Sequence, residues 1–120
     1  MAQLLDVPTV RDPRGALSVI DGLLPFDIKR LFFLYDVSAR RGEHRQKETT
    51  QALIAMSGTI EVFCDNGTVA ETFVLDSPAK CLVVPPEDYR WMDGFQPGSV
   101  LLVASSTSYD PDDTIWEAWR

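Results

Sequence analysis

Residues 40–51 read RRGEHRQKETTQ and hold the only histidine of the chain, His44, within its densest cluster of charge. In an extended strand, side chains alternate between the two faces, so the spacing predicts His44, Gln46 and Glu48 on one face. A titratable imidazole then lies beside an amide. The apolar run at 52–56 follows directly, so a polar strand is expected to continue into a buried one. Small β-barrels use this arrangement to direct side chains into their own mouth.

Short segments rich in β-branched and aromatic residues occur on both sides of this stretch and predict strands. The predicted strands are 16–20, 28–35, 52–56, 59–64, 68–75, 81–84 and 99–104. Residues 28–35 carry apolar side chains on both faces, so we expect both faces to be at least partly covered. In 59–64 the alternation is clean and predicts that Ile60, Val62 and Cys64 share one face.

Turn signals separate these strands, and DNG at 65–67 is the strongest, because Asn-Gly fits the positive φ of a tight hairpin. Only residues 114–120 predict a helix, with Trp116 and Trp119 on one face. Many short strands with turns between them are typical of an antiparallel sandwich or barrel. We therefore expect an all-β fold, with residues 1–120 forming one antiparallel jelly-roll barrel and a short C-terminal helical tail.

The composition excludes several classes of partner. The formal net charge is −7, whereas nucleic acids and anionic membranes attract basic proteins. No apolar run approaches the roughly 20 residues of a membrane-spanning helix. Residues 1–6 lack the features of a signal peptide, so we expect a cytoplasmic protein. Cys64 and Cys81 lie in apolar surroundings without the spacing of a metal site, which predicts buried free thiols.

Basic residues gather at 29–30 and 40–47, although the protein is acidic overall. A locally basic site on an acidic protein suits a small anionic ligand. The candidates for phosphate and oxyanion contacts are Arg14, Arg30, Arg41 and Lys47. Metal sites need several imidazole, thiolate or carboxylate ligands, and this chain has one histidine. We therefore expect neither a metal nor another cofactor.

The spacing of Gly42, His44, Gln46, Gln51 and Gly58 resembles the first motif of the cupin superfamily. In metal-binding cupins the three middle positions hold His, His and Glu. Two of these three positions are amides here, which agrees with a site that works without metal.

A longer set of segments resembles the bacterial sugar 3,4-ketoisomerases, WxcM-like cupin-fold enzymes. These enzymes act on dTDP-4-keto-6-deoxyhexoses during synthesis of surface polysaccharides and glycosylated antibiotics. The matching segments lie within about residues 12–115 and are DPRG at 12–15, LPFDIKR at 24–30, RGEHRQK at 41–47, LDSP at 75–78 and VAS at 103–105. The resemblance implies an isomerase of deoxysugar biosynthesis that binds a dTDP-linked keto-deoxysugar. It also implies a homodimer that shares strands between subunits.

The family usually has a second histidine at the position of Gln46, a tyrosine at that of Phe33 and a Trp-His pair at that of Tyr89 and Arg90. The resemblance implies that His44 is the acid/base that moves a proton between neighbouring carbons. Gln46 can donate a hydrogen bond to an enediolate oxygen but cannot be the base. Gln51 and Arg90 join the candidates for substrate binding.

Two other functions stay open. A non-catalytic nucleotide-sugar-binding cupin that partners a related enzyme would explain the absent second histidine. A purely structural cupin subunit would explain the tryptophans of the tail but not the basic cluster. Phe32, Phe33 and Tyr35 are expected in the core rather than in contact with a ligand.

Overall fold

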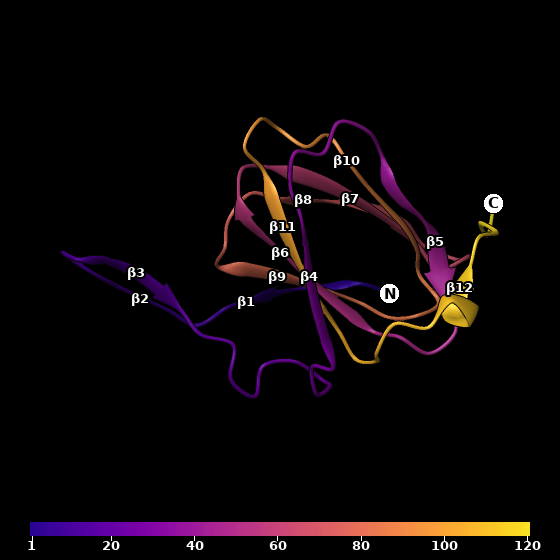
Figure 1. The fold of residues 1–120 in the computed structure, drawn as a ribbon, viewed down its shortest axis with the longest axis horizontal. Coiled ribbons are helices and arrows are strands. Elements are labelled where there is room, and N and C mark those ends of the chain that lie inside the picture. Colours follow the sequence, from indigo (N-terminus) through magenta and orange to yellow (C-terminus); the bar gives the residue numbers. More distant parts are fainter.

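Two five-stranded antiparallel sheets lie face to face in the computed structural model, which describes residues 1–120 (Figure 1). The first sheet consists, in spatial order, of β1 (Gln3–Asp6), β9 (Lys80–Val84), β6 (Gln51–Ser57), β11 (Val100–Ser105) and β4 (Arg30–Leu34). The second consists of β12 (Thr114–Ile115), β5 (Arg41–Gln46), β10 (Tyr89–Asp93), β7 (Ile60–Asp65) and β8 (Ala70–Leu75). A separate hairpin pairs β2 (Thr9–Asp12) with β3 (Gly15–Ser18), and η1 (Pro111–Asp113) is a single 3-10 turn. The predicted all-β antiparallel jelly roll is confirmed.

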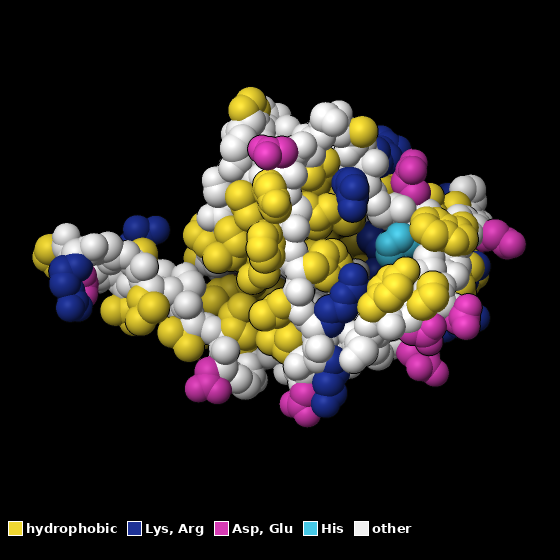
Figure 2. Space-filling model, viewed as in Figure 1, with side chains coloured by type: hydrophobic (Ala, Val, Ile, Leu, Met, Phe, Trp, Pro, Cys, Tyr) yellow, Lys and Arg dark blue, Asp and Glu magenta, His cyan; other side chains and the backbone are white.

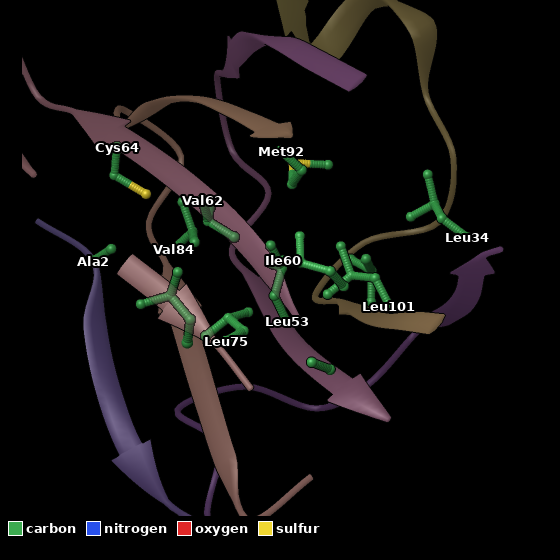
Figure 3. Close-up of a cluster of buried hydrophobic side chains, with 13 residues drawn as sticks. Ala2, Leu34, Leu53, Ile60, Val62, Cys64, Leu75, Val84, Met92 and Leu101 are labelled. Atoms are coloured by element: carbon green, nitrogen blue, oxygen red, sulfur yellow. The ribbon is translucent and has the colours of Figure 1, made fainter. Parts of the chain in front are cut away.

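The core lies between the two sheets and contains 13 buried residues (Figure 3). Leu53 of β6 and Leu101 of β11 meet Ile60 and Val62 of β7 there, and all four are almost completely buried. Removing such a side chain from water contributes about 1.5–3 kcal/mol. The alternation predicted for the strand at 59–64 is confirmed, because Ile60, Val62 and Cys64 are each 0% exposed.

Both cysteines are buried free thiols, as the sequence predicts. Burial raises the pKa of Cys64 to about 12 and that of Cys81 to about 11, so both thiols stay protonated at neutral pH. No helix in the structure has the length and apolar character needed to cross a membrane.

The helical tail expected at 114–120 is wrong. Residues Thr114 and Ile115 form β12, which pairs with Gln46 and Arg45 of β5, and the rest of the tail is not helical. Isolated helices this short are marginal in water, so contacts with the barrel decide the conformation. Trp116 and Trp119 do not share a helical face, because one packs beside His44 and the other donates to the backbone of Glu87.

One face of β4 is exposed in the single chain. Leu31, Phe33 and Tyr35 are each about 60% exposed, and the last two stack with ring centroids 6.0 Å apart. The expectation that both faces of 28–35 are covered, with Phe33 and Tyr35 in the core, is therefore wrong for one chain alone. Phe32, on the opposite face, packs partly against the core as expected.

The hairpin of β2 and β3 projects from the barrel as an arm (Figure 1). Its strands pair only with each other, and Val10 and Leu17 are each 63% exposed. The two-residue turn at its tip contains Arg14. The arm contributes to the elongated shape of the chain, whose extents are 48 × 30 × 25 Å.

Candidate active site

A pocket of about 240 Å³ opens between the two sheets at one end of the barrel. His44 and Gln46 reach it from β5, and Arg30 and Gln51 reach it from β4 and β6. Residues around η1 close its outer side. Figure 2 shows the histidine at the edge of a hollow with basic side chains beside it. The structure thus brings four of the predicted site residues to the barrel mouth.

An irregularity in β5 directs His44 into this pocket. Gly42 and Glu43 both have positive φ, and the pairing of β5 with β10 shifts register at this point. A Cβ on Gly42 would lie 3.1 Å from the carbonyl oxygen of Arg90, so glycine allows the close approach of the two strands. His44 and Gln46 share a face as predicted. Glu48 does not join them, because β5 ends at Gln46.

Asp113 holds the chain where β5 ends. Its carboxylate accepts hydrogen bonds from the backbone N–H of Glu48 and the hydroxyl of Thr49, and its carbonyl accepts from the N–H of Lys47. Burial alone would raise the pKa of Asp113, but these hydrogen bonds outweigh it and lower the pKa. Asp113 thus anchors the segment after β5 to η1.

His44 is half-buried and neutral at pH 7. Burial, reinforced by the positive charge of Arg90, lowers its pKa from 6.5 to about 4. Its Nδ1 atom is buried and has no hydrogen-bond partner in the chain. The ring of Trp116 meets the imidazole edge-on, with centroids 5.7 Å apart. His44 therefore offers an uncharged imidazole, the form that can accept a proton.

Arg90 lies behind Gln46 and Gln51, outside the pocket lining, and is 1% exposed. It makes five hydrogen bonds within the chain, as many as a guanidinium has N–H groups. Two go to the side-chain oxygens of Gln46 (2.7 Å) and Gln51 (3.1 Å), and three go to the backbone oxygens of Pro85, Pro86 and Asp88. Burial lowers its pKa to about 10, so it stays charged at pH 7. With its donors engaged, Arg90 supports the site rather than offering a free contact to substrate.

The contacts of Arg90 fix the orientation of two amides. A guanidinium has no acceptor, so the oxygen atoms of Gln46 and Gln51 must face it. The amide nitrogen of Gln51 then donates to Ser105 Oγ at 3.2 Å. The amide nitrogen of Gln46 donates to no atom of the chain. Gln46 also lines the pocket. Gln46 thus presents a donor to whatever the pocket binds.

Arg30 is the free cation of the pocket. Its guanidinium lies over the ring of Phe32 at 4.5 Å and over the ring of Tyr109 at 4.9 Å. None of the five ion pairs in the chain includes it. A positive charge without an internal partner is available to an anionic ligand.

The other basic candidates lie outside this pocket. Arg41 is exposed and borders a second, more open hollow of about 360 Å³ that also touches His44 and Trp116. Lys47 is exposed just beyond the end of β5. Arg14 lies in the turn of the arm and pairs with Asp12. A single chain therefore does not bring Arg14 to the barrel mouth.

Sequence reasoning missed several parts of this site. It placed Trp116 on a helical tail, and it did not single out Tyr109 or Thr49, which line the pocket. Nor did it suggest that Arg90 is buried, because charged side chains are usually exposed. The structure contains no group of three His, Cys, Asp or Glu side chains that could hold a metal ion.

Comparison with known proteins gives consistent matches. A family model described as FdtA: WxcM-like, C-terminal matches residues 1–119. A relative from Aneurinibacillus thermoaerophilus, TDP-4-oxo-6-deoxy-alpha-D-glucose-3,4-oxoisomerase, is 32% identical over 117 residues, or 94% of this chain and 84% of that protein.

Solved structures agree with these matches. QdtA, a sugar 3,4-ketoisomerase from Thermoanaerobacterium thermosaccharolyticum in complex with TDP, superposes with a TM-score of 0.92 at 32% identity, over 97% of this chain and 88% of that one. WlaRB, a TDP-quinovose 3,4-ketoisomerase from Campylobacter jejuni, has the same TM-score and identity, over 97% and 92%. The dTDP-4-dehydrorhamnose 3,5-epimerase from Bacillus anthracis, 16% identical with a TM-score of 0.80, shares the fold.

Proposed function

Because this chain belongs to the FdtA family, described as WxcM-like, C-terminal, we propose that it is a TDP-sugar 3,4-ketoisomerase of deoxysugar biosynthesis. The resemblance inferred from its sequence is confirmed by the family match and by the 32% identical relative. The observation that carries the proposal is a neutral imidazole and an oriented amide donor, His44 and Gln46, side by side in one pocket. The names of the relatives favour an isomerase over a binding protein without activity.

The reaction moves a carbonyl between adjacent carbons of the sugar. In a 4-keto sugar, neutral His44 takes the proton from C3, and the C–H electron pair forms an enediolate with the C4 oxygen. The protonated imidazole then gives a proton to C4, while the C3 hydroxyl passes its own proton to the C4 oxygen and becomes the new carbonyl. One base serves both carbons if the transfer stays on one face of the ring.

The enediolate oxygen needs a donor in place before charge develops. The amide nitrogen of Gln46 is that donor, because Arg90 holds the amide oxygen on the opposite side. Arg30 adds a positive charge at the same pocket. Gln51 accepts a hydrogen bond from Arg90 and donates one to Ser105, so we assign it as a positioning residue rather than a substrate contact.

The size of the pocket decides which part of the substrate enters it. Pockets for drug-sized ligands measure about 300–1,000 Å³. The pocket at His44 measures about 240 Å³, so it suits the hexose alone. The diphosphate then lies outside, where Arg41 borders the neighbouring hollow and Lys47 is exposed nearby. No step of this route requires a metal.

Proton exchange tests the proposal directly. TDP-4-keto-6-deoxyglucose is incubated with the protein in D₂O, with and without a chelator, and followed by NMR. We expect deuterium at C3 of the starting sugar and at C4 of a 3-keto product, because the protonated imidazole can exchange with D₂O during turnover, and both results should be insensitive to the chelator. His44→Asn should slow the reaction by about a hundred- to ten-thousand-fold, the usual contribution of an acid/base group. Binding without exchange in the wild-type protein would instead support the non-catalytic binding function.

A further inference from the structure

Trp116 stands where the two hollows of the barrel mouth meet. It lines the pocket that holds His44 and Gln46, and it also borders the open hollow beside Arg41. Only His44 and Trp116 belong to both hollows. A ligand that extends from one hollow into the other must therefore pass these two side chains.

The backbone on both sides of Trp116 is held in place. Before it, Ile115 pairs with Arg45 in the β12–β5 ladder. After it, the carbonyl of Glu117 accepts a hydrogen bond from Arg45 Nε at 2.9 Å. Arg45 also lies 3.8 Å above the ring of Trp119. Arg45 thus fixes the tail on either side of Trp116.

The end of the tail is anchored separately. Trp119 donates from Nε1 to the carbonyl of Glu87 at 2.8 Å, and its ring lies against Gly67, where a Cβ would come within 3.2 Å of it. Arg120 donates twice to the carboxylate of Asp65, at 2.8 and 2.9 Å. These contacts form a strap, residues 114–120, that holds Trp116 at the mouth without covering it.

The indole of Trp116 is 70% exposed although its backbone is fixed. Single exposed aromatic side chains are common, so exposure alone is no evidence of a ligand. The evidence is the combination of a fixed backbone, a ring edge-on to the imidazole at 83° and a position shared by both hollows. An aromatic face so placed offers an apolar surface to a ring that enters the pocket.

We propose that Trp116 is a substrate-binding residue that packs against the hexose and selects sugar nucleotides over the free nucleotide. This inference rests on the proposed function, because His44 must act at the ketone for its neighbour to touch the sugar. With centroids 5.7 Å apart, the two rings are in contact, so a sugar that reaches the imidazole also lies beside the indole. The C–H faces of a pyranose are apolar and pack on aromatic rings, whereas the charged diphosphate has no such preference.

Binding of TDP and of TDP-4-keto-6-deoxyglucose tests this inference, measured by calorimetry in the His44→Asn background to prevent turnover. Trp116→Ala should weaken binding of the sugar nucleotide by about tenfold, the value of one aromatic contact, and leave TDP binding unchanged. Trp116→Phe keeps an aromatic face and should retain most of the affinity. The Tm of both variants should match that of the parent, since the indole is mostly exposed.

Fluorescence gives an independent measurement. The chain has three tryptophans, and in a Trp91→Phe variant only Trp116 and Trp119 remain. The sugar nucleotide should change their emission more than TDP does, and Trp116→Phe should abolish the difference.

Three results would overturn the inference. Equal affinity of Trp116→Ala and its parent for the sugar nucleotide would contradict it, although the proposed function would stand. Equal losses for TDP and the sugar nucleotide would mean that Trp116 contacts the nucleotide instead. A parent protein that binds neither ligand would remove the proposed function and this inference together.

Discussion

At the scale of single residues, the charge of Arg90 helps to set the protonation of His44. The chain has one histidine, so its imidazole gives one resonance that can be followed by NMR from pH 3 to 9. We expect a midpoint near the pKa of about 4. Arg90→Gln should move it upward towards 6.5, while Arg11→Gln, which removes an exposed charge on the arm, should not. A wild-type midpoint at 6.5 or above would contradict this account.

The lowered pKa of His44 also determines how the free energy of unfolding changes with pH. Because the fold favours neutral His44, the unfolded chain binds more protons between pH 4 and 6.5, and the free energy of unfolding rises with pH over this window. The contribution of His44 to stability is therefore lost as the pH falls from 6.5 towards 4. In His44→Asn this part of the dependence should be absent, which denaturant titrations at several pH values would measure.

Gln46→Glu separates the two roles of this side chain. A carboxylate still accepts from Arg90, but it has no N–H for the enediolate and adds repulsion. Loss of one such donor costs about 10²–10³ in kcat. We expect a folded protein with that loss of kcat in the isomerase assay, whereas wild-type activity would mean that Gln46 is not the donor.

The spacing of the sequence was enough to place His44 and Gln46 on one face, since period-2 alternation follows from backbone geometry alone. It could not reveal that Arg90 is buried and saturated by oxygens from three segments, because those segments meet only in the fold. The same reason explains why the positions of Arg14 and Lys47 were not predicted: a basic residue carries no signal for which cavity it faces.

At the scale of elements, the strands with clean apolar alternation were predictable and those held by tertiary pairing were not. β1, β2, β10 and β12 were missed, and β10 carries buried Arg90 where an apolar residue would signal a strand. The tail resembles a helix by the spacing of its tryptophans, but its hydrogen bonds go to β5 and to Glu87.

The strap gives a prediction at this scale. Arg120→Met removes both hydrogen bonds to Asp65, whose side chain is 2% exposed, so the Tm at pH 7 should fall by a few degrees. Arg120 lowers the pKa of Asp65, so the stabilisation is present above the unfolded pKa of about 3.9 and is lost as the pH falls through the folded value. The Tm difference between wild type and variant should therefore close in strong acid. A difference that persists there would point to packing rather than charge.

At the scale of the whole molecule, the arm and the exposed face of β4 are two apolar surfaces without a partner. Val10, Leu17, Leu31, Phe33 and Tyr35 are all at least 59% exposed. An exposed edge of this kind is a hazard that pairing across a two-fold axis removes. We therefore predict a homodimer, with light scattering giving twice the chain mass at micromolar concentration. Leu17→Asp combined with Phe33→Asp should give a folded monomer, and a monomeric wild type would contradict the prediction.

Arg14 lies in the turn between β2 and β3, away from the pocket of its own chain, so we expect it to act only across such a dimer. We expect the arm to bring it to the second subunit's site, where it would contact the substrate phosphates. Arg14→Ala and His44→Asn should each have low activity alone. Refolding the two variants together should restore part of the activity, because some of the mixed dimers then contain one intact site. An unchanged kcat/KM in Arg14→Ala would exclude any contribution of this side chain.

Because Arg90 is buried and all of its N–H groups are engaged, the residues at positions 46 and 90 cannot be exchanged independently. A shorter residue at position 90 would leave the oxygens of Gln46, Gln51 and the Pro85–Asp88 loop without hydrogen-bond donors. A charged histidine ring at position 46 would face the guanidinium of Arg90. Neither change is tolerated well on its own, so their effects should be strongly non-additive. The resemblance implies histidines at these two positions in the family, so exchanging this amide–guanidinium pair for two histidines should cost stability at either single step.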